Sequence, residues 1–361
     1  MARWLQLTKA GGLAVGAVVA GAGAVIAAEK AAVGRLRFYP DPAAAEPLGQ
    51  LRDQSLAVLA DDGVPLHVEI TGPDDAPVTI VFSHGYTLSQ DVWHYQRQAL
   101  RTAAGPARLV FWDQRGHGKS GHGDPGHSTI AQLGADLGAV VAATVPAGGR
   151  VVLVGHSMGG MTVMALAAQR PELFELGSPV AQVAGTMLIS TASSGIDPAH
   201  WLPAPLRLIV RQAAPSVLRG VSRTRAAAAI EHARRATADV AFLTARYIAF
   251  GDPRVSPAIV DFLERIIRAT PVEVVAEFYL ALLDHDQELS LETLGRAPCT
   301  VLIGDRDRLL SARRCGEMAD RIPGAELIVV PRAGHVVILE RPDVVNEAVT
   351  ALLAKVLADI V

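Results

Sequence analysis

From Ser55 onward, short apolar runs rich in β-branched residues alternate along the chain with longer amphipathic stretches. Each apolar run is bounded by turn residues, as is typical of strands buried in a sheet. The runs predict strands over 55–60, 64–71, 78–82, 108–112, 150–154, 183–189, 300–303 and 326–330. The stretches between them predict helices over 91–104, 129–145, 157–169, 312–321 and 342–358. Strands that alternate with helices form parallel βαβ units, so the pattern indicates an α/β fold with a doubly wound, mostly parallel sheet.

This alternation stops between residues 194 and 296, where only helical patterns occur. The clearest pattern is an apolar stripe at helical spacing, and a second stripe precedes it. The two stripes consist of Ile259, Phe262, Leu263, Ile266 and Ile267, and of Leu206, Ile209, Val210 and Ala213. We therefore expect a helical insert over 194–296 within an α/β core made of residues 54–193 and 297–361.

The N-terminal residues 1–30 contain an unusual apolar segment. Gly11 to Ala28 are 18 uncharged residues, close to the shortest length that spans a bilayer, but Ala and Gly dominate and make the segment weakly hydrophobic. An uncleaved anchor, a signal peptide cut after Ala22-Gly23-Ala24, and a soluble Ala/Gly helix or tail all stay open. We favour membrane association through residues 11–28, in the cell envelope or as an exported protein, with a cytoplasmic location still open. Residues 31–53 contain three prolines and predict a linker.

Charge and cysteine content exclude several classes of partner. A formal net charge of −3 gives no sign of nucleic-acid binding, and the sequence carries no signal for an oligomeric state. Cys299 and Cys315 have neither metal-ligand spacing nor the number needed for a disulfide framework. His285 lies between Asp284 and Asp286, but no second cluster supports a metal site, so we expect it to be solvated or to order a loop. We expect no cofactor and no metal.

The residues Gly155-His156-Ser157-Met158-Gly159 stand between a predicted buried strand and a predicted helix. A serine hydroxyl becomes a nucleophile only when it is held in position and a base removes its proton. A sharp strand-to-helix turn provides the position, and Gly155 and Gly159 relieve the crowding that this turn creates. The turn also places Ser157 at a helix N-terminus, where backbone N–H groups favour a developing anion. The pattern predicts that Ser157 is a nucleophile.

Further stretches occur in order along the chain and, with this elbow, resemble the α/β-hydrolase family. They are Ser83-His84-Gly85-Tyr86, Asp113-Gln114-Arg115-Gly116-His117-Gly118-Lys119-Ser120, Gly304-Asp305-Arg306-Asp307 and Gly334-His335. The resemblance covers residues 55–360 and is to the serine esterase and lipase branch with a helical cap. It implies that the α/β-hydrolase sheet carries the strands and that residues 194–296 form the cap.

The resemblance also implies a catalytic triad in the chain order Ser157, Asp307, His335. Histidine titrates near neutral pH, so His335 can accept the serine proton and later donate it to the leaving group. The carboxylate would hold the imidazole in one tautomer. Asp305 is a rival for this role and is expected to cap or pair locally instead. Asp197 occupies a place where some relatives keep their acid, and it is a less favoured alternative.

The oxyanion hole is expected to consist of two backbone N–H groups, those of Tyr86 and Met158. Donors of this kind are worth about 100- to 1000-fold each in rate. His84, His117 and His156 lie in the family motifs, but none occupies the position of the base. We expect each of these three histidines to order a loop by hydrogen bonding.

The cap and the elbow together suggest a substrate. Four apolar residues near the start of the insert, Trp201, Leu202, Leu206 and Ile209, would form an apolar lid, unless they pack only on neighbouring helices. The leading hypothesis is hydrolysis of carboxylic esters with apolar acyl groups, through an acyl-enzyme on Ser157. The partner is then a small ester or lipid-like molecule.

Other chemistries of the same fold need different residues. Epoxide hydrolases and haloalkane dehalogenases need an aspartate at the elbow, so Ser157 argues against both, although Tyr247 and Tyr279 lie in the cap. A cofactor-free haloperoxidase-like enzyme or a carbon–carbon bond hydrolase keeps the serine and stays open. A ligand-sensing member of the fold with slow turnover is the alternative from another functional class.

Overall fold

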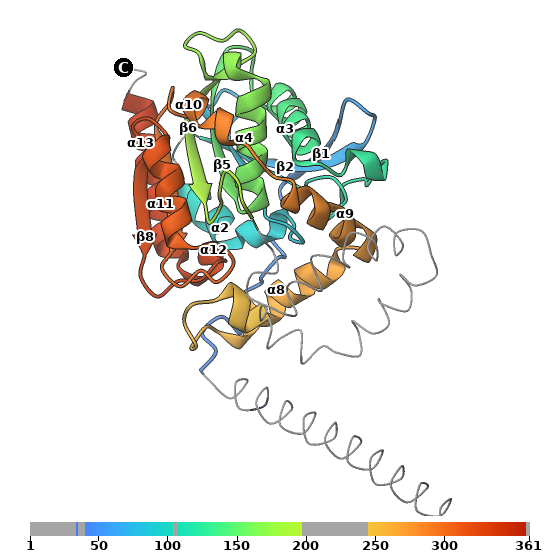
Figure 1. Cartoon of the computed structure of the whole chain (residues 1–361), viewed down its shortest axis with the longest axis vertical. Helices are drawn as coiled ribbons and strands as arrows, with labels where there is room; N and C mark the ends of the chain where they lie inside the picture. The colour runs from blue at the N-terminus through green and yellow to red at the C-terminus, as the bar shows by residue number, and fades with distance from the viewer. Residues whose placement is uncertain (1–33, 35–39, 104, 106, 197–244, 359–361) are drawn as a thin grey trace, which may run out of the picture.

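A computed structural model describes residues 34, 40–103, 105, 107–196 and 245–358. Its centre is an eight-stranded sheet with the strand order β1-β2-β4-β3-β5-β6-β7-β8 (Figure 1). The strands are β1 (Gln54–Leu59), β2 (Pro65–Thr71), β3 (Val78–Ser83), β4 (Arg108–Trp112), β5 (Gly149–His156), β6 (Ala181–Ile189), β7 (Cys299–Gly304) and β8 (Glu326–Val330). Only the β1–β2 and β2–β4 pairs are antiparallel, so the predicted doubly wound, mostly parallel sheet is confirmed.

Helices cover both faces of the sheet. The flanking helices are α2 (His94–Ala103), α3 (Ile130–Thr144), α4 (Met158–Gln169), α10 (Leu291–Leu294), α11 (Ala312–Arg321), α12 (Val337–Glu340) and α13 (Pro342–Ala358). Side chains of β5 alternate between the faces: Val151 and Leu153 pack in one core with α3 and α4, while Val152 and Val154 pack in the other with α13. A strand covered on both faces must be apolar at every position, which explains the continuous apolar runs of the sequence.

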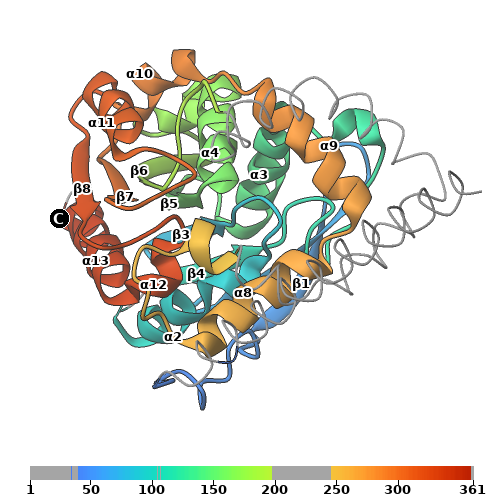
Figure 2. The ribbon, with the colours of Figure 1, turned by 60° about the horizontal axis from the view of Figure 1, so that its bottom comes forward.

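The part of the insert that the structure describes is helical. A short helix occupies 245–249, followed by α8 (Pro257–Ala269) and α9 (Val272–Leu283), and Figure 2 shows α8 and α9 apart from the helices that flank the sheet. The predicted stripe on α8 is largely buried, because Ile259, Phe262, Leu263 and Ile266 all pack in the core on the α13 face. Asp197 and the proposed lid residues 201–209 lie outside the described residues.

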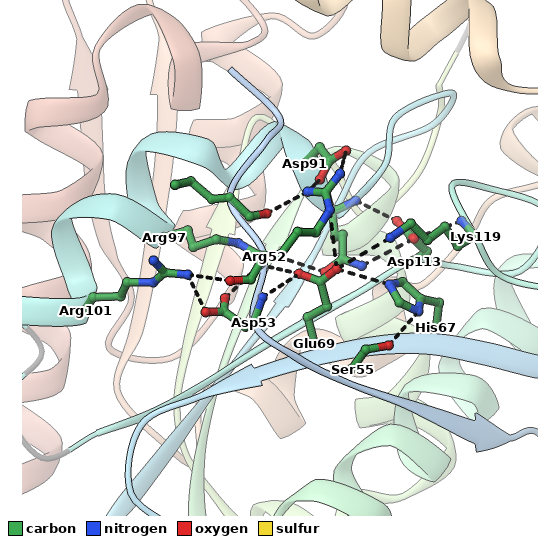
Figure 3. A network of polar contacts seen from close by, with 12 residues as sticks. Arg52, Asp53, Ser55, His67, Glu69, Asp91, Arg97, Arg101, Asp113 and Lys119 are labelled. Atoms are coloured by element: carbon green, nitrogen blue, oxygen red, sulfur yellow. Dashed lines mark hydrogen bonds and ion pairs between the residues drawn. The ribbon is translucent and has the colours of Figure 1, made fainter. Parts of the chain in front are cut away.

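Residues 40–53, within the stretch predicted to be a linker, pack closely against the rest of the protein. Leu48 is buried, and the Asp41 carboxylate accepts hydrogen bonds from Ser256 Oγ and the Ala258 N–H at the start of α8. Figure 3 shows a polar network at the end of this stretch, in which the buried Arg97 contacts Asp53 Oδ2 at 2.7 Å. These contacts hold the chain that enters β1 against α2 and α8.

The apolar segment 11–28 lies outside the described residues. Among the helices that the structure describes, none combines the length and the apolar character needed to cross a bilayer. Association of residues 11–28 with a membrane therefore stays a prediction.

Candidate active site

Ser157 occupies a strained turn between β5 and α4. Its backbone has φ +52° and ψ −117°, a conformation that costs a non-glycine residue about 1–3 kcal/mol. Two hydrogen bonds hold it there: the Ser157 N–H donates to the Ile189 carbonyl at 2.9 Å, and Thr191 Oγ1 donates to the Ser157 carbonyl at 2.8 Å. The end of β6 therefore stabilises the turn that presents Ser157.

The two glycines of the elbow are required by the close approach of strand and helix. A Cβ atom on Gly155 would lie 2.4 Å from the Gly159 carbonyl oxygen. A Cβ atom on Gly159 would lie 2.1 Å from the carbonyl oxygen of Ser83, at the end of β3. No side chain larger than hydrogen fits at either position, because real Cβ contacts do not come this close.

The structure brings His335 and Asp307 together, as the sequence predicts. His335 Nδ1 lies 2.8 Å from Asp307 Oδ2, and the Asp307 side chain is fully buried. The other oxygen, Asp307 Oδ1, accepts the backbone N–H groups of Leu309 and Leu310, both at 2.8 Å. Asp305 instead accepts the backbone N–H of Arg332, in the loop after β8, at 2.6 Å. Asp307 is thus the carboxylate that can orient the His335 ring.

Ser157 and His335 both line a cavity of about 470 Å³ at the carboxyl ends of the parallel strands. The loop after β3 contributes Gly85 and Tyr86 to its wall. Much of the remaining wall is apolar, and includes Leu88, Met161, Leu263, Ile267, Leu282 and Leu310. No Asp, Glu, Lys or Arg belongs to the lining that the structure describes. Such a site suits a neutral, apolar molecule, because burying a charge without a partner is costly.

The loop that carries Tyr86 is held by two buried histidines. His84 donates from Nδ1 to the Gly85 carbonyl at 2.8 Å, and its Nε2 accepts the Gln114 N–H at 3.0 Å. His117 Nε2 accepts the Thr87 N–H at 3.2 Å. Burial lowers the pKa of His84 to about 4 and that of His117 to about 3, so both rings are neutral and can accept these N–H groups. Both act as loop-ordering residues.

The third motif histidine, His156, links the elbow to His335. Its ring is fully buried, and Nε2 donates to the His335 carbonyl at 3.0 Å. Burial, with the nearby positive charge of a protonated His335 as a smaller cause, lowers the pKa of His156 to about 3. Because this pKa lies far below neutral pH, the ring is a poor acceptor for the Ser157 proton, which is consistent with a role in loop order.

The remaining sequence candidates are His285, a metal site and the Tyr86 side chain. His285 is buried rather than solvated, and its Nε2 hydrogen-bonds to the Ala192 carbonyl at 2.9 Å, so it orders a loop. Within the described ranges, no three His, Cys, Asp or Glu side chains are grouped so that they could hold a metal ion. The Tyr86 hydroxyl donates to the Val275 carbonyl on α9, which ties the loop after β3 to the insert.

Sequence reasoning missed one residue at this site. Glu340, five positions after His335, accepts the N–H of Gly334 at 2.6 Å and also binds backbone N–H groups of the insert. Its partners in the insert are about 90 positions away, so no local pattern marked this residue as part of the site.

Comparison with known proteins identifies the family. The family model described as "Alpha/beta hydrolase family" matches residues 80–348. The sn-1-specific diacylglycerol lipase of Mus musculus is 26% identical over 311 residues, which cover 81% of this chain and 86% of the lipase. A non-heme chloroperoxidase of Burkholderia pyrrocinia is 35% identical over 133 residues, covering 37% of this chain and 44% of that protein.

A solved structure agrees with this match. The thermophilic esterase of Thermogutta terrifontis superposes with a TM-score of 0.63 at 24% identity, and the match covers 84% of this chain and 99% of the esterase. At this identity the likeness concerns the fold. Because the family model spans well over half of the sequence, this chain belongs to the alpha/beta hydrolase family and is a hydrolase of that fold.

Proposed function

We propose that the protein hydrolyses carboxylic esters with apolar acyl groups, through an acyl-enzyme on Ser157. The observation that carries this proposal is that a strained serine and a histidine bound to a buried carboxylate line the same apolar cavity. Asp307 keeps a proton on His335 Nδ1, so that Nε2 is available as the base. Residues 194–296 are proposed as the cap, since Leu263, Ile267 and Leu282 from this range form part of the cavity wall.

The reaction then follows in two halves. His335 Nε2 removes the Ser157 proton as the hydroxyl oxygen attacks the ester carbonyl, and returns this proton to the departing alcohol. The backbone N–H groups of Tyr86 and Met158 are proposed to stabilise the oxyanion. Two features support their position: a Cβ on Gly85 would lie 3.2 Å from Ser157 Cβ, and Met158 opens α4, where first-turn N–H groups lack partners within the helix. Water releases the acyl group with His335 as base.

A panel of p-nitrophenyl esters of graded chain length tests this function, with Ser157→Ala as the matched variant. We expect turnover that is lost in Ser157→Ala, and covalent labelling of the wild-type protein by a fluorophosphonate. Full activity in Ser157→Ala, or no hydrolysis of any ester by a folded and labelled wild type, would contradict the proposal.

A second candidate is a cofactor-free haloperoxidase-like reaction. The likeness to the non-heme chloroperoxidase over 133 residues favours it. Halide oxidation with hydrogen peroxide, measured beside ester hydrolysis on one preparation, separates the two. Faster halide oxidation than ester turnover would reverse the order of the two candidates.

A further inference from the structure

Residues 247–252, which precede α8, lie directly on the two loops that carry Asp307 and His335. Four hydrogen bonds reach this segment from those loops, one of them from Arg308 to the Tyr247 carbonyl. Arg308 donates to the Phe250 carbonyl at 3.1 Å, and Arg306 donates to the carbonyl of residue 251 at 3.1 Å. The Val336 N–H donates to the Ala249 carbonyl at 3.0 Å. The residues on either side of Asp307 and the residue after His335 therefore hold one stretch of the insert.

The Glu340 carboxylate completes this arrangement. Its Oε1 accepts the N–H of Gly251 at 2.9 Å and that of Asp252 at 2.5 Å. Its Oε2 accepts the N–H of Gly334, the residue before His335, at 2.6 Å. One side chain thus binds the histidine loop and segment 247–252 at once, through N–H groups that leave little freedom to either.

The backbones themselves are in contact at this point. A Cβ on Gly334 would lie 2.5 Å from the Gly251 nitrogen, and a Cβ on Gly251 would lie 2.6 Å from the Ala333 carbonyl carbon. Close packing of this kind fixes the distance between the two segments, because the two glycines have no side chains that could move aside. The relative position of the two segments then depends on the hydrogen bonds that set their register.

The same segment is part of the cavity wall. Ile248 and Ala249 line the cavity beside His335 and Val336. A shift of this stretch would therefore change both the space for the substrate and the position of the base.

We infer that Glu340 is a positioning residue: its carboxylate holds the His335 loop and segment 247–252 in one arrangement, so that the cavity wall and the base keep a fixed relation. This inference rests on the proposed function, in which His335 is the base. A displacement of about 1 Å in a reacting group can cost about 100-fold in rate. Among the contacts described, Glu340 touches neither Ser157 nor the cavity lining, so its effect must pass through the His335 loop or through segment 247–252.

Glu340→Gln tests the role with little change in size. A glutamine has one acceptor oxygen, and its amide nitrogen would face an N–H of Gly334 or of segment 247–252. We expect kcat for p-nitrophenyl acetate to fall 10- to 100-fold with KM changed less than threefold, because an acetyl group has little apolar surface to contact the cavity wall. The rate of fluorophosphonate labelling should fall by the same factor. Glu317→Gln is the matched control, since Glu317 is exposed and, among the contacts described, pairs with Arg313 one helical turn away. This variant should behave as wild type.

The result that overturns the inference is a Glu340→Gln protein that melts like wild type and keeps kcat and labelling rate within twofold. If Glu340→Gln does not fold, Glu340→Asp is the second variant, because it keeps the charge but is one methylene too short to hold the N–H groups of Gly334 and Gly251 together. An unchanged labelling rate in a folded Glu340→Asp protein would overturn the inference, and a 3- to 10-fold loss would support it. A wild type that neither labels nor hydrolyses esters would instead overturn the proposed function.

Discussion

Replacement of Asp307 by asparagine is predicted to give His335 the wrong tautomer. Asp307 Oδ1 accepts two backbone N–H groups, those of Leu309 and Leu310, so the asparagine oxygen must take this side. The reverse orientation would place an amide N–H against two donors, and each unsatisfied buried group costs about 1–3 kcal/mol. The amide nitrogen therefore faces His335 and donates to Nδ1, which forces the ring proton onto Nε2.

The size of the loss follows from this geometry. With a proton on Nε2, His335 cannot accept the Ser157 proton, and a tautomer error of this kind costs about 10⁴-fold in kcat. At about 1.4 kcal/mol for each factor of ten, this loss in kcat corresponds to about 5.5 kcal/mol of transition-state stabilisation. The shape of the side chain is kept, and the cavity does not contain Asp307 among its lining residues, so KM should change little.

Steady-state hydrolysis of p-nitrophenyl butyrate measures the effect, with Asp305→Asn as the matched control. Asp305 is exposed and accepts only the Arg332 N–H among the contacts described, a bond that an asparagine oxygen can keep. We expect Asp305→Asn to stay within threefold of wild type. A loss of less than tenfold in folded Asp307→Asn, or a larger loss in Asp305→Asn, would refute the reasoning.

Three further predictions concern the elbow, the insert and the cavity. Gly159→Ala should destabilise the protein by at least about 2 kcal/mol in urea denaturation and abolish turnover, because its Cβ would lie 2.1 Å from the Ser83 carbonyl oxygen. His122 Nε2 lies 2.6 Å from a Glu277 carboxylate oxygen on α9, and this hydrogen bond raises the pKa of His122 in the folded protein. The contact should therefore stabilise the protein at a pH below the unfolded-state pKa of about 6.5. This stabilisation should be lost as the pH rises through the higher pKa of the folded state. The melting temperature of His122→Gln should therefore lie below that of wild type at about pH 5 and match it at about pH 9. Ile267→Trp should fill part of the cavity and lower kcat/KM for the decanoate ester more than tenfold, with the acetate ester within threefold.

The sheet was predictable because each of its strands carries a local signal. Four of the five residues in the predicted strand 150–154 are apolar, and the observed β5 extends it by one residue at its start and two at its end. The turn at Ser157 was equally predictable from the sequence, since part of the crowding that requires Gly155 and Gly159 arises between residues close together in the chain. Local patterns therefore contained the strands, the helices and the identity of the strained serine.

Contacts between distant segments left no such signal. Glu69 lies within β2, where its neighbours suggest an ordinary exposed position, yet it is buried against Arg97 of α2 at 2.5 Å (Figure 3). The contact of Glu340 with Gly251 depends on two loops that meet only after the insert has folded onto the core. These arrangements depend on how the elements pack, which neither periodicity nor motif spacing records.

The loop Asp113–Ser120 lies outside the cavity lining but contacts the segment that carries Tyr86. Arg115 is fully buried and binds Asp136 through two hydrogen bonds of 2.6 Å, although buried ion pairs add little net stability. Their directional contacts fix the loop, and the loop in turn places Gln114 and His117 against the segment that carries Tyr86. An oxyanion donor is effective only if it is held in place before the reaction. The buried pair therefore contributes mainly by fixing the geometry of this loop. Removing it should lower stability, and should also lower kcat through the Tyr86 loop, which is proposed to supply an oxyanion donor.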